Sequence, residues 1–354
     1  MIYVNMKLRQ LRNSMIKPKT PFFLKLLFLI CIFAGCSKPI PSQSEFALDT
    51  VCTITLYEHG RPQIYRAIFD RLLEIEQRMS VHLEGTDVDR INKSAGVEPV
   101  KVNNDVFMLI ERAVYFAELS GGAFDPSVGP LVSLWNIGGD NERVPSPSEI
   151  ESVLPLINWR DIELDSVNKT VFLKKPGMAL DLGGIAKGYA ADEAASIIKN
   201  AKIPRAIVDL GGNIITIGTK PDRTPWRIGI QNPVDDRGAY IGIVQIREKT
   251  AVTSGVYERF FIEDDVRYHH IFSTVDGYPA ENGLLSVTII TGCSADADAL
   301  STAVFVLGFE KGMELVNSLE GVDVIFVFED RSVRISGGIE FTLTDENFRI
   351  VSLQ

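Results

Sequence analysis

The sequence predicts an α+β fold with mixed or antiparallel sheets rather than a doubly wound parallel sheet. From residue 206 onward the chain is dominated by short β-type runs, at 206–209, 214–217, 227–230, 241–246, 285–290, 322–328 and 333–335. Helical patterns are interspersed among these runs without the strict strand–helix alternation of a parallel sheet. The 354 residues are 45% hydrophobic and 23% charged, which is typical of a globular chain. Because no internal repeat or interior linker divides it, residues 46–354 are interpreted as one folded domain, with room for two lobes.

Hydrophobic periodicity predicts two long helices in the first half of the chain. Apolar residues recur every three or four positions over 63–79, which is the spacing of an amphipathic helix. A second helix is predicted from about Asn104, a plausible N-cap, as far as the pair Gly121-Gly122.

Two shorter features follow. Ser148 and Glu151 match the pattern of a capping box at the start of a short helix. Residues 161–173 match a β-hairpin whose turn lies at 165–169. Both features are predicted to be structural.

The N-terminal segment is interpreted as a secretion signal with a lipid-attachment cysteine. Residues 1–25 carry basic residues and no acidic ones, and an apolar run over 26–34 follows. Phe33-Ala34-Gly35-Cys36 resembles a lipobox, so 1–35 would be removed and Cys36 acylated. Residues 36–45 would form a tether, and the protein would be lipid-anchored to a cell membrane, facing the periplasm or the exterior. Ordinary cleavage with a free Cys36, or an uncleaved anchor, are the alternatives.

Charge and cysteine content narrow the classes of function. Removal of 1–35 takes away six basic residues and lowers the net charge from −10 to about −16, which disfavours nucleic-acid binding. Cys31 would leave with the signal and Cys36 would carry lipid. The remaining Cys52 and Cys293 belong to no zinc-binding pattern and are interpreted as small buried residues.

A loop rich in glycine and proline follows the second helix, at residues 121–130. Its backbone groups and the Asp125 carboxylate could face a ligand. Taken alone, this pattern favours a structural loop.

Residues 181–189 form a Gly-Gly turn that leads into a helix predicted over about 189–200. Free N–H groups and the positive end of the helix dipole at such a turn suit a phosphate or pyrophosphate, and Lys187 adds a cation. The segment matches neither a Walker A loop nor Gly-x-Gly-x-x-Gly. Its spacing leaves a second interpretation equally open, that of a tight turn with a surface lysine.

Two of the four histidines are adjacent, at His269-His270. Neighbouring residues of a strand face opposite sides, so at most one of the two can point into a given cleft. One would then be a base or a ligand contact and the other a surface residue. A purely structural role remains the alternative.

Asp298 and Thr302 lie four residues apart in a helix predicted from about Ser294 to near Gly308. They therefore share one helical face, where a carboxylate and a hydroxyl could hold a hard cation such as Mg²⁺. The alternative is helix capping, which accounts for Asp296 better than for Asp298.

Eight segments in this order resemble the ApbE family of FAD:protein FMN transferases over essentially the whole chain from Leu48 to Gly308. The segments are 48–50, 79–82, 124–132, 180–190, 210–213, 253–255, 269–270 and 295–308. The chain has Leu48-Asp49-Thr50 where the family commonly has Met-Gly-Thr. The resemblance implies an ApbE-like fold with FAD between two lobes and Mg²⁺ at its pyrophosphate.

The resemblance also implies roles for individual residues. Mg²⁺ would be held by Gly184, through its carbonyl, and by Asp298 and Thr302. His270 would lie beside the reacting phosphate as the catalytic residue. Contacts to FAD would come from Leu48, His82, Ala123, Phe124, Asp125, Asp181, Lys187 and Phe272.

The implied reaction is Mg²⁺-dependent transfer of FMN from FAD to a threonine or serine of another protein, with release of AMP. The acceptor would carry a Ser/Thr-containing motif and would typically be a subunit of a membrane redox pump. One rival is an Mg²⁺-dependent FAD pyrophosphatase, in which water replaces the hydroxyl. The other is a flavin-binding lipoprotein without turnover, against which the retained Asp298, Thr302 and His270 argue.

Overall fold

The computed structural model describes residues 42–352. The predictions of a signal at 1–35 and of lipid on Cys36 lie outside the described residues. Strand β1 (Ser42–Ala47) begins inside the segment predicted to be a tether, so the folded domain begins by residue 42 rather than 46. The side chains of β1 are mostly exposed and polar, which explains why its sequence resembles a linker. Among the described residues, no helix is long and apolar enough to cross a membrane.

The main sheet has nine strands in the order β1-β2-β6-β7-β10-β13-β14-β15-β17. Every neighbouring pair in it is antiparallel except β15 and β17. Beyond β1, its strands are β2 (Thr50–Leu56), β6 (Ala206–Leu210), β7 (Asn213–Ile217), β10 (Thr250–Gly255), β13 (Leu284–Thr291), β14 (Asp323–Phe328), β15 (Ser332–Ile335) and β17 (Arg349–Ile350).

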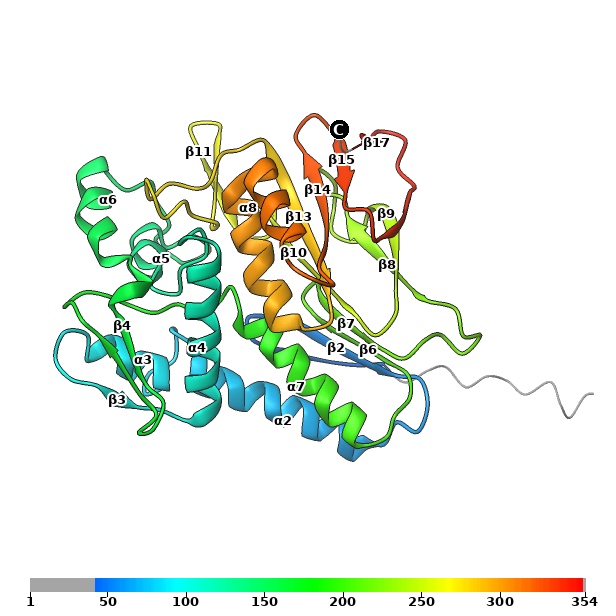
Figure 1. Ribbon diagram of the computed structural model, residues 1–354, viewed down its shortest axis with the longest axis horizontal. Helices are drawn as coiled ribbons and strands as arrows, with labels where there is room; N and C mark the ends of the chain where they lie inside the picture. Colours follow the sequence, from blue (N-terminus) through cyan, green and yellow to red (C-terminus); the bar gives the residue numbers. More distant parts are fainter. Residues whose placement is uncertain (1–41, 353–354) are drawn as a thin grey trace, which may run out of the picture. The chain divides into compact units, whose positions relative to one another are not determined.

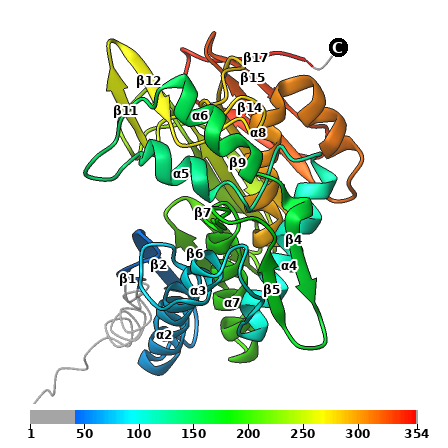
Figure 2. The same ribbon diagram turned by 90° about the vertical axis from the view of Figure 1, so that its left-hand side faces the viewer.

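Three small sheets complete the β-structure. One contains β16 (Glu340–Leu343), β9 (Tyr240–Ile246) and β8 (Trp226–Gln231), and another contains β3 (Val100–Lys101), β5 (Thr170–Leu173) and β4 (Ile162–Asp165). The third is the hairpin of β11 (Phe260–Glu263) and β12 (Val266–His269), which lies at the periphery in Figure 2.

The helices are α2 (Pro62–Met79), α3 (Asp87–Lys93), α4 (Asn104–Leu119), α5 (Gly129–Trp135), α6 (Pro147–Val153), α7 (Ala186–Asn200) and α8 (Ser294–Asn317), with short 3₁₀ turns at Leu154–Leu156 and Trp159–Asp161. Helices α7 and α8 lie against one face of the main sheet, and α2 packs on α7 (Figure 1). The β8-β9-β16 sheet covers the opposite face, where Trp226 and Val244 pack against Ile290 and Ile325.

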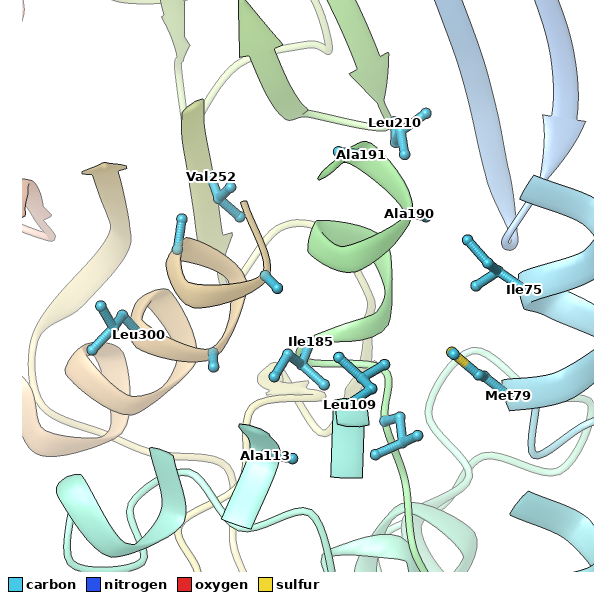
Figure 3. Close-up of a cluster of buried hydrophobic side chains, with 14 of the residues drawn as sticks. Ile75, Met79, Leu109, Ala113, Ile185, Ala190, Ala191, Leu210, Val252 and Leu300 are labelled. Atoms are coloured by element: carbon cyan, nitrogen blue, oxygen red, sulfur yellow. The ribbon is translucent and has the colours of Figure 1, made fainter. Parts of the chain in front are cut away.

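The central strands are buried on both faces because their residues alternate between two cores. Val287 and Ile289 of β13 belong to the large core on the helix side, whereas Ile290 belongs to the core on the other side. Figure 3 shows Ile185, just before α7, among buried side chains that include Leu109 of α4. The described residues form one compact unit, so the two expected lobes are parts of one domain. The α+β prediction is confirmed.

Two predictions about helix starts need correction. The N-cap of α4 is Asn103 rather than Asn104, and its side chain donates to Asp87 Oδ2 at 2.8 Å instead of capping the helix. The capping box of α6 is Ser146 with Glu149, not Ser148 with Glu151. The two patterns overlap in the sequence, and Pro147 decides between them because proline is favoured at the first helical position.

Helix α8 departs from its predicted end. Gly308 has non-helical angles (φ 75°, ψ −176°), as expected for a helix stop, but a second helical segment continues to Asn317.

Of the two cysteines, Cys52 is fully buried as predicted. Cys293 is only half-buried and occupies the N-cap position of α8.

Candidate active site

Two hairpin tips meet at one end of the main sheet. The loops Leu48-Asp49 and Gly211-Gly212 each join two strands through two residues with positive φ, the geometry of a type I′ turn. Because β2 pairs with β6, these tips are neighbours, and a Cβ added to Gly211 would lie 2.1 Å from Thr50 Oγ1. Only glycine permits this approach.

The Leu48-Asp49 turn is strained, because residues other than glycine rarely adopt φ values of 54° and 58°. Such backbone costs on the order of 1 kcal/mol per residue and persists only where its surroundings hold it. Here the Leu48 N–H donates to Glu76 Oε1 at 3.0 Å, and Asp49 Oδ2 lies 3.7 Å from Arg259 Nη2. The tip is therefore fixed beside the segment that precedes His270.

The predicted phosphate turn leads directly into α7. Asp181 Oδ1 accepts a hydrogen bond from the Gly183 N–H at 2.7 Å and shapes the turn. Helix α7 begins at Ala186, three residues before its predicted start, so Lys187 and Gly188 lie in its first turn. N–H groups in a first helical turn have no partner within their own helix, and here the Ala186 N–H donates to Leu182 O at 2.8 Å and the Gly188 N–H to Asp298 Oδ2 at 2.9 Å.

The start of α7 presses against α8 and against the 121–130 loop. A Cβ at Gly184 would lie 3.1 Å from Phe124 Cε2 and 3.5 Å from Thr302 Oγ1. A Cβ at Gly188 would lie only 2.2 Å from Ser294 O, so glycine is required at this helix crossing. The structure therefore brings Gly184, Phe124 and Thr302 together.

Asp298 is the buried carboxylate of the site, with only 6% of its surface exposed. Its Oδ2 accepts the Gly188 N–H at 2.9 Å, while its Oδ1 receives no hydrogen bond from any described residue. Burial raises the pKa of Asp298, and the nearby Lys187 ammonium opposes that rise. A desolvated carboxylate with an unused oxygen is stabilised by a cation.

The hydroxyl of Thr302 lies one turn further along α8. Its Oγ1 is 3.4 Å from Ser254 Oγ, and that hydroxyl is 2.8 Å from Ser301 Oγ. The Gly184 carbonyl, the Asp298 carboxylate and the Thr302 hydroxyl would make an all-oxygen donor set with one negative charge. Such a set fits Mg²⁺, which keeps several waters and takes few protein ligands. No group of three or more His, Cys, Asp or Glu that could hold a metal occurs within residues 42–352.

His270 and His269 have different environments. His270 Nδ1 lies 3.1 Å from the Arg259 carbonyl, which also accepts the His270 backbone N–H at 3.2 Å. A carbonyl can only accept, so Nδ1 carries the proton and Nε2 keeps its lone pair. Burial, helped by the charges of Arg259 and Lys187, lowers the pKa of His270 to about 3. The neutral ring is thus held with the lone pair of Nε2 unused by any described residue.

His269 is not a surface residue, which corrects the prediction for the second histidine. It is 5% exposed, its Nδ1 accepts the Ile271 N–H at 3.3 Å, and its ring packs edge-on against Phe305. Burial lowers its pKa to about 4, and a hydrogen bond to the Ala280 backbone opposes this. It lies at the end of β12, and its role is structural.

The Asp125 carboxylate accepts hydrogen bonds mainly from its own loop. Its Oδ1 accepts both the backbone N–H and the hydroxyl of Ser127, at 2.8 and 2.7 Å, and its Oδ2 accepts the Trp159 N–H at 3.0 Å. Burial raises its pKa despite these bonds. The carboxylate therefore braces the loop that holds Phe124 beside Gly184, and direct contact with a ligand stays a prediction.

The other residues predicted to contact FAD lie in separate parts of the structure. Phe272 is buried in a third small core against Trp135, with ring centroids 5.7 Å apart. Ala123 is half-buried, and its neighbour Gly122 accepts the Thr274 hydroxyl at 2.8 Å, which joins the loop to the segment after His270. His82 is exposed, and its backbone N–H bonds Ser80 Oγ. The structure brings none of these side chains onto Asp298.

Several polar residues of the site were not singled out from the sequence. Ser254 and Asn213 belong to the motifs 253–255 and 210–213, but only the fold shows their contacts. Asn213 is 3% exposed, its Oδ1 accepts the Ser294 hydroxyl at 2.6 Å, and its Nδ2 has no hydrogen-bond partner among the described residues. Asp192 and Arg259 carried no signal beyond their charge.

Comparison with solved structures identifies the class to which this fold belongs. An ApbE protein from Thermotoga maritima superposes with a TM-score of 0.76 and 38% identity, covering 85% of this chain and 96% of that one. The flavin transferase ApbE from Vibrio cholerae gives a TM-score of 0.74 at 26% identity, covering 87% of this chain and 97% of that one. The fold is that of the ApbE flavin transferases.

Sequence comparison agrees. The model of the ApbE family matches residues 48–326, and the chain therefore belongs to the ApbE family. A Treponema pallidum protein named FAD:protein FMN transferase is 40% identical over 316 residues, which cover 84% of this chain and 87% of that protein. A Klebsiella pneumoniae protein of the same name is 36% identical over 312 residues, covering 88% and 96% respectively.

Proposed function

We propose that this chain is an FAD:protein FMN transferase, an enzyme that moves FMN from FAD to a hydroxyl of another protein. The observation that carries the proposal is a neutral His270 whose Nε2 is unused, together with a Lys187 ammonium whose charge acts on the pKa of both His270 and the buried Asp298. Membership of a family whose named relatives are FAD:protein FMN transferases supports the same reaction.

FAD would bind with its pyrophosphate at the start of α7. The positive end of the α7 dipole and the Lys187 ammonium suit two negative phosphates. Phe124, which lies beside Gly184, and Leu48, at the tip of the β1–β2 hairpin, would contact the remainder of the molecule. Gly184, Asp298 and Thr302 would hold Mg²⁺, which when bound would neutralise phosphate charge.

His270 would act as the general base. Its Nε2 accepts the proton of the acceptor hydroxyl while the hydroxyl oxygen bonds to the FMN-side phosphorus. The bond from that phosphorus to the bridging oxygen breaks, and AMP leaves with that oxygen. The Arg259 carbonyl, which holds Nδ1–H, keeps the ring in the tautomer that this step needs.

The acceptor would be a threonine or serine in a Ser/Thr-containing motif of a membrane redox-pump subunit, as the family resemblance implies. Lipid on Cys36 would hold the enzyme at the membrane that carries such a subunit, facing the periplasm or the exterior. The basic and apolar residues before Cys36 support this anchor.

The test is incubation of the protein with FAD, Mg²⁺ and a threonine-containing peptide, followed by mass analysis of the peptide. The expected product carries one FMN phosphoester, and the Thr→Ala peptide stays unlabelled. Release of AMP and free FMN without a labelled peptide would identify an FAD pyrophosphatase instead. Retention of intact FAD with neither product would identify a flavin-binding protein.

A further inference from the structure

Helix α8 begins without a cap from its own residues. Its N-cap is Cys293, whose side chain makes no capping bond with the helix. The first N–H groups of a helix need acceptors, and an uncompensated start costs about 1 kcal/mol. The residues that satisfy this start therefore also fix where α8 lies.

The missing cap comes from α7. Asp192 Oδ1 accepts the Ser294 N–H and Oδ2 accepts the Ala295 N–H, both at 2.9 Å. Cys293 Sγ also donates to Oδ2, at 3.3 Å. A carboxylate at this place complements the positive end of the helix dipole and binds both N–H groups at once.

The same two helices are joined a second time, one turn away. Gly188 lies four residues before Asp192 on α7, and Asp298 lies four residues after Ser294 on α8, so each pair shares a helical face. The Gly188 N–H donates to Asp298 Oδ2 at 2.9 Å. The two contacts fix the register of α8 against α7, and the absence of a Cβ at Gly188 lets the helices approach.

We propose that Asp192 is a positioning residue for the metal-binding face of α8, because its carboxylate holds Asp298 and Thr302 in place relative to Gly184 at the start of α7. This inference rests on the proposed function, in which these three residues hold Mg²⁺. Its hydrogen bonds go to Cys293, Ser294 and Ala295 and not to Thr302 or Gly184, so Asp192 acts through the helix start.

The test compares Asp192→Ala and Asp192→Asn in the full chain. Metal binding is measured by titration with Mn²⁺, an oxygen-preferring substitute for Mg²⁺ whose free form is detected by electron paramagnetic resonance. Loss of a residue that orients metal ligands typically weakens binding by about 10- to 100-fold, and Asp192→Ala is expected in this range. Asp192→Asn keeps one acceptor oxygen for one of the two N–H groups and should lose less.

Asp296→Ala is the matched control. Asp296 lies in the same first turn of α8 and carries the same charge, but it pairs with Arg112 of α4 rather than with α7. Its loss should change Mn²⁺ affinity by less than about threefold, as expected for a partly screened charge. If Asp192 acted by charge alone, Asp192→Asn and Asp192→Ala would weaken binding equally, and the positioning role would be overturned.

Two further readouts separate positioning from general stability. Hydrogen exchange at the Ser294 and Ala295 amides should accelerate in Asp192→Ala and stay slow in Asp296→Ala. Transfer by Asp192→Ala should recover at high Mg²⁺, so that the metal concentration for half-maximal rate rises while kcat changes little. Unchanged Mn²⁺ affinity in a variant with accelerated exchange would overturn the inference and leave the proposed function intact. A wild-type protein that binds no Mn²⁺ would remove the proposed metal site itself.

Discussion

Replacement of His270 by asparagine isolates the atom on which the proposed reaction depends. The asparagine amide nitrogen takes the place of Nδ1 and can still donate to the Arg259 carbonyl, the bond that is 3.1 Å long in the structure. What disappears is Nε2, the nitrogen with the unused lone pair. The variant therefore keeps the local fold and loses the base.

The expected loss follows from the role. A positioned general base contributes about 10²- to 10⁴-fold in rate, which corresponds to about 3 to 5 kcal/mol of transition-state free energy. FAD affinity should change little, because the groups at the start of α7 are untouched. The assay is FMN transfer to a threonine peptide under single-turnover conditions, with FAD binding measured separately by flavin fluorescence.

His269→Asn is the matched control. It removes a neighbouring histidine of the same size whose Nδ1 is already engaged by the Ile271 N–H, so it should lower stability but leave the rate per folded molecule near normal. Equal transfer rates for His270→Asn and wild type would remove His270 from the mechanism. Equal losses in the two variants would show that the site merely needs both rings for packing.

Three further predictions address the metal, acid stability and the anchor. Asp298→Asn should abolish Mg²⁺-dependent turnover at any metal concentration while FAD binding is kept. Thr302→Ala should lower turnover less, because a neutral ligand binds a cation less strongly than a carboxylate does. Transfer rates measured across a series of Mg²⁺ concentrations check both. The pKa of His269 is about 4 when folded and about 6.5 when unfolded, so the unfolded state takes up the proton first as pH falls, and about 3 kcal/mol of stability should be lost between these values. Urea unfolding at pH 7 and pH 4.5 measures this loss, and a His269→Gln variant should show a smaller one. Cys36→Ala should release the protein from membranes, and intact-mass analysis that finds no acyl group on wild-type Cys36 would contradict the anchor.

Periodicity predicted the fold where burial is one-sided or continuous. The helix over 63–79 and the strands around 206–217 and 285–290 agree with α2, β6, β7 and β13 because their apolar residues face a core. Strands β1 and β11 escaped prediction because their side chains are mostly exposed, whereas β10 escaped it although its side chains are mostly buried. The pairing register of a strand depends on both paired segments, so the sequence of one segment does not predict it.

The site was predictable to the extent that its chemistry lies in short segments. Asp298 and Thr302 could be paired from helical spacing, and Lys187 from its place after a Gly-Gly turn. The contact of Asp192 with the start of α8 spans about a hundred residues, and the carbonyl that orients His270 belongs to Arg259, just before β11. Every residue type carries the same backbone carbonyl, so no sequence motif predicts a contact made by one.

The charges around His270 make its basicity depend on the substrate. Burial and the cations Lys187 and Arg259 lower its pKa to about 3, a value at which the ring is a poor proton acceptor. A bound pyrophosphate would bring negative charge to the same cations, and compensation of their field raises the pKa of a neighbouring histidine. A bound pyrophosphate would therefore shift the pKa of His270 upward, the direction that favours acceptance of the proton of the attacking hydroxyl. The attacking group can be a protein hydroxyl, which gives transfer, or water, which gives hydrolysis. An acceptor segment that excludes water from Nε2 favours transfer over hydrolysis.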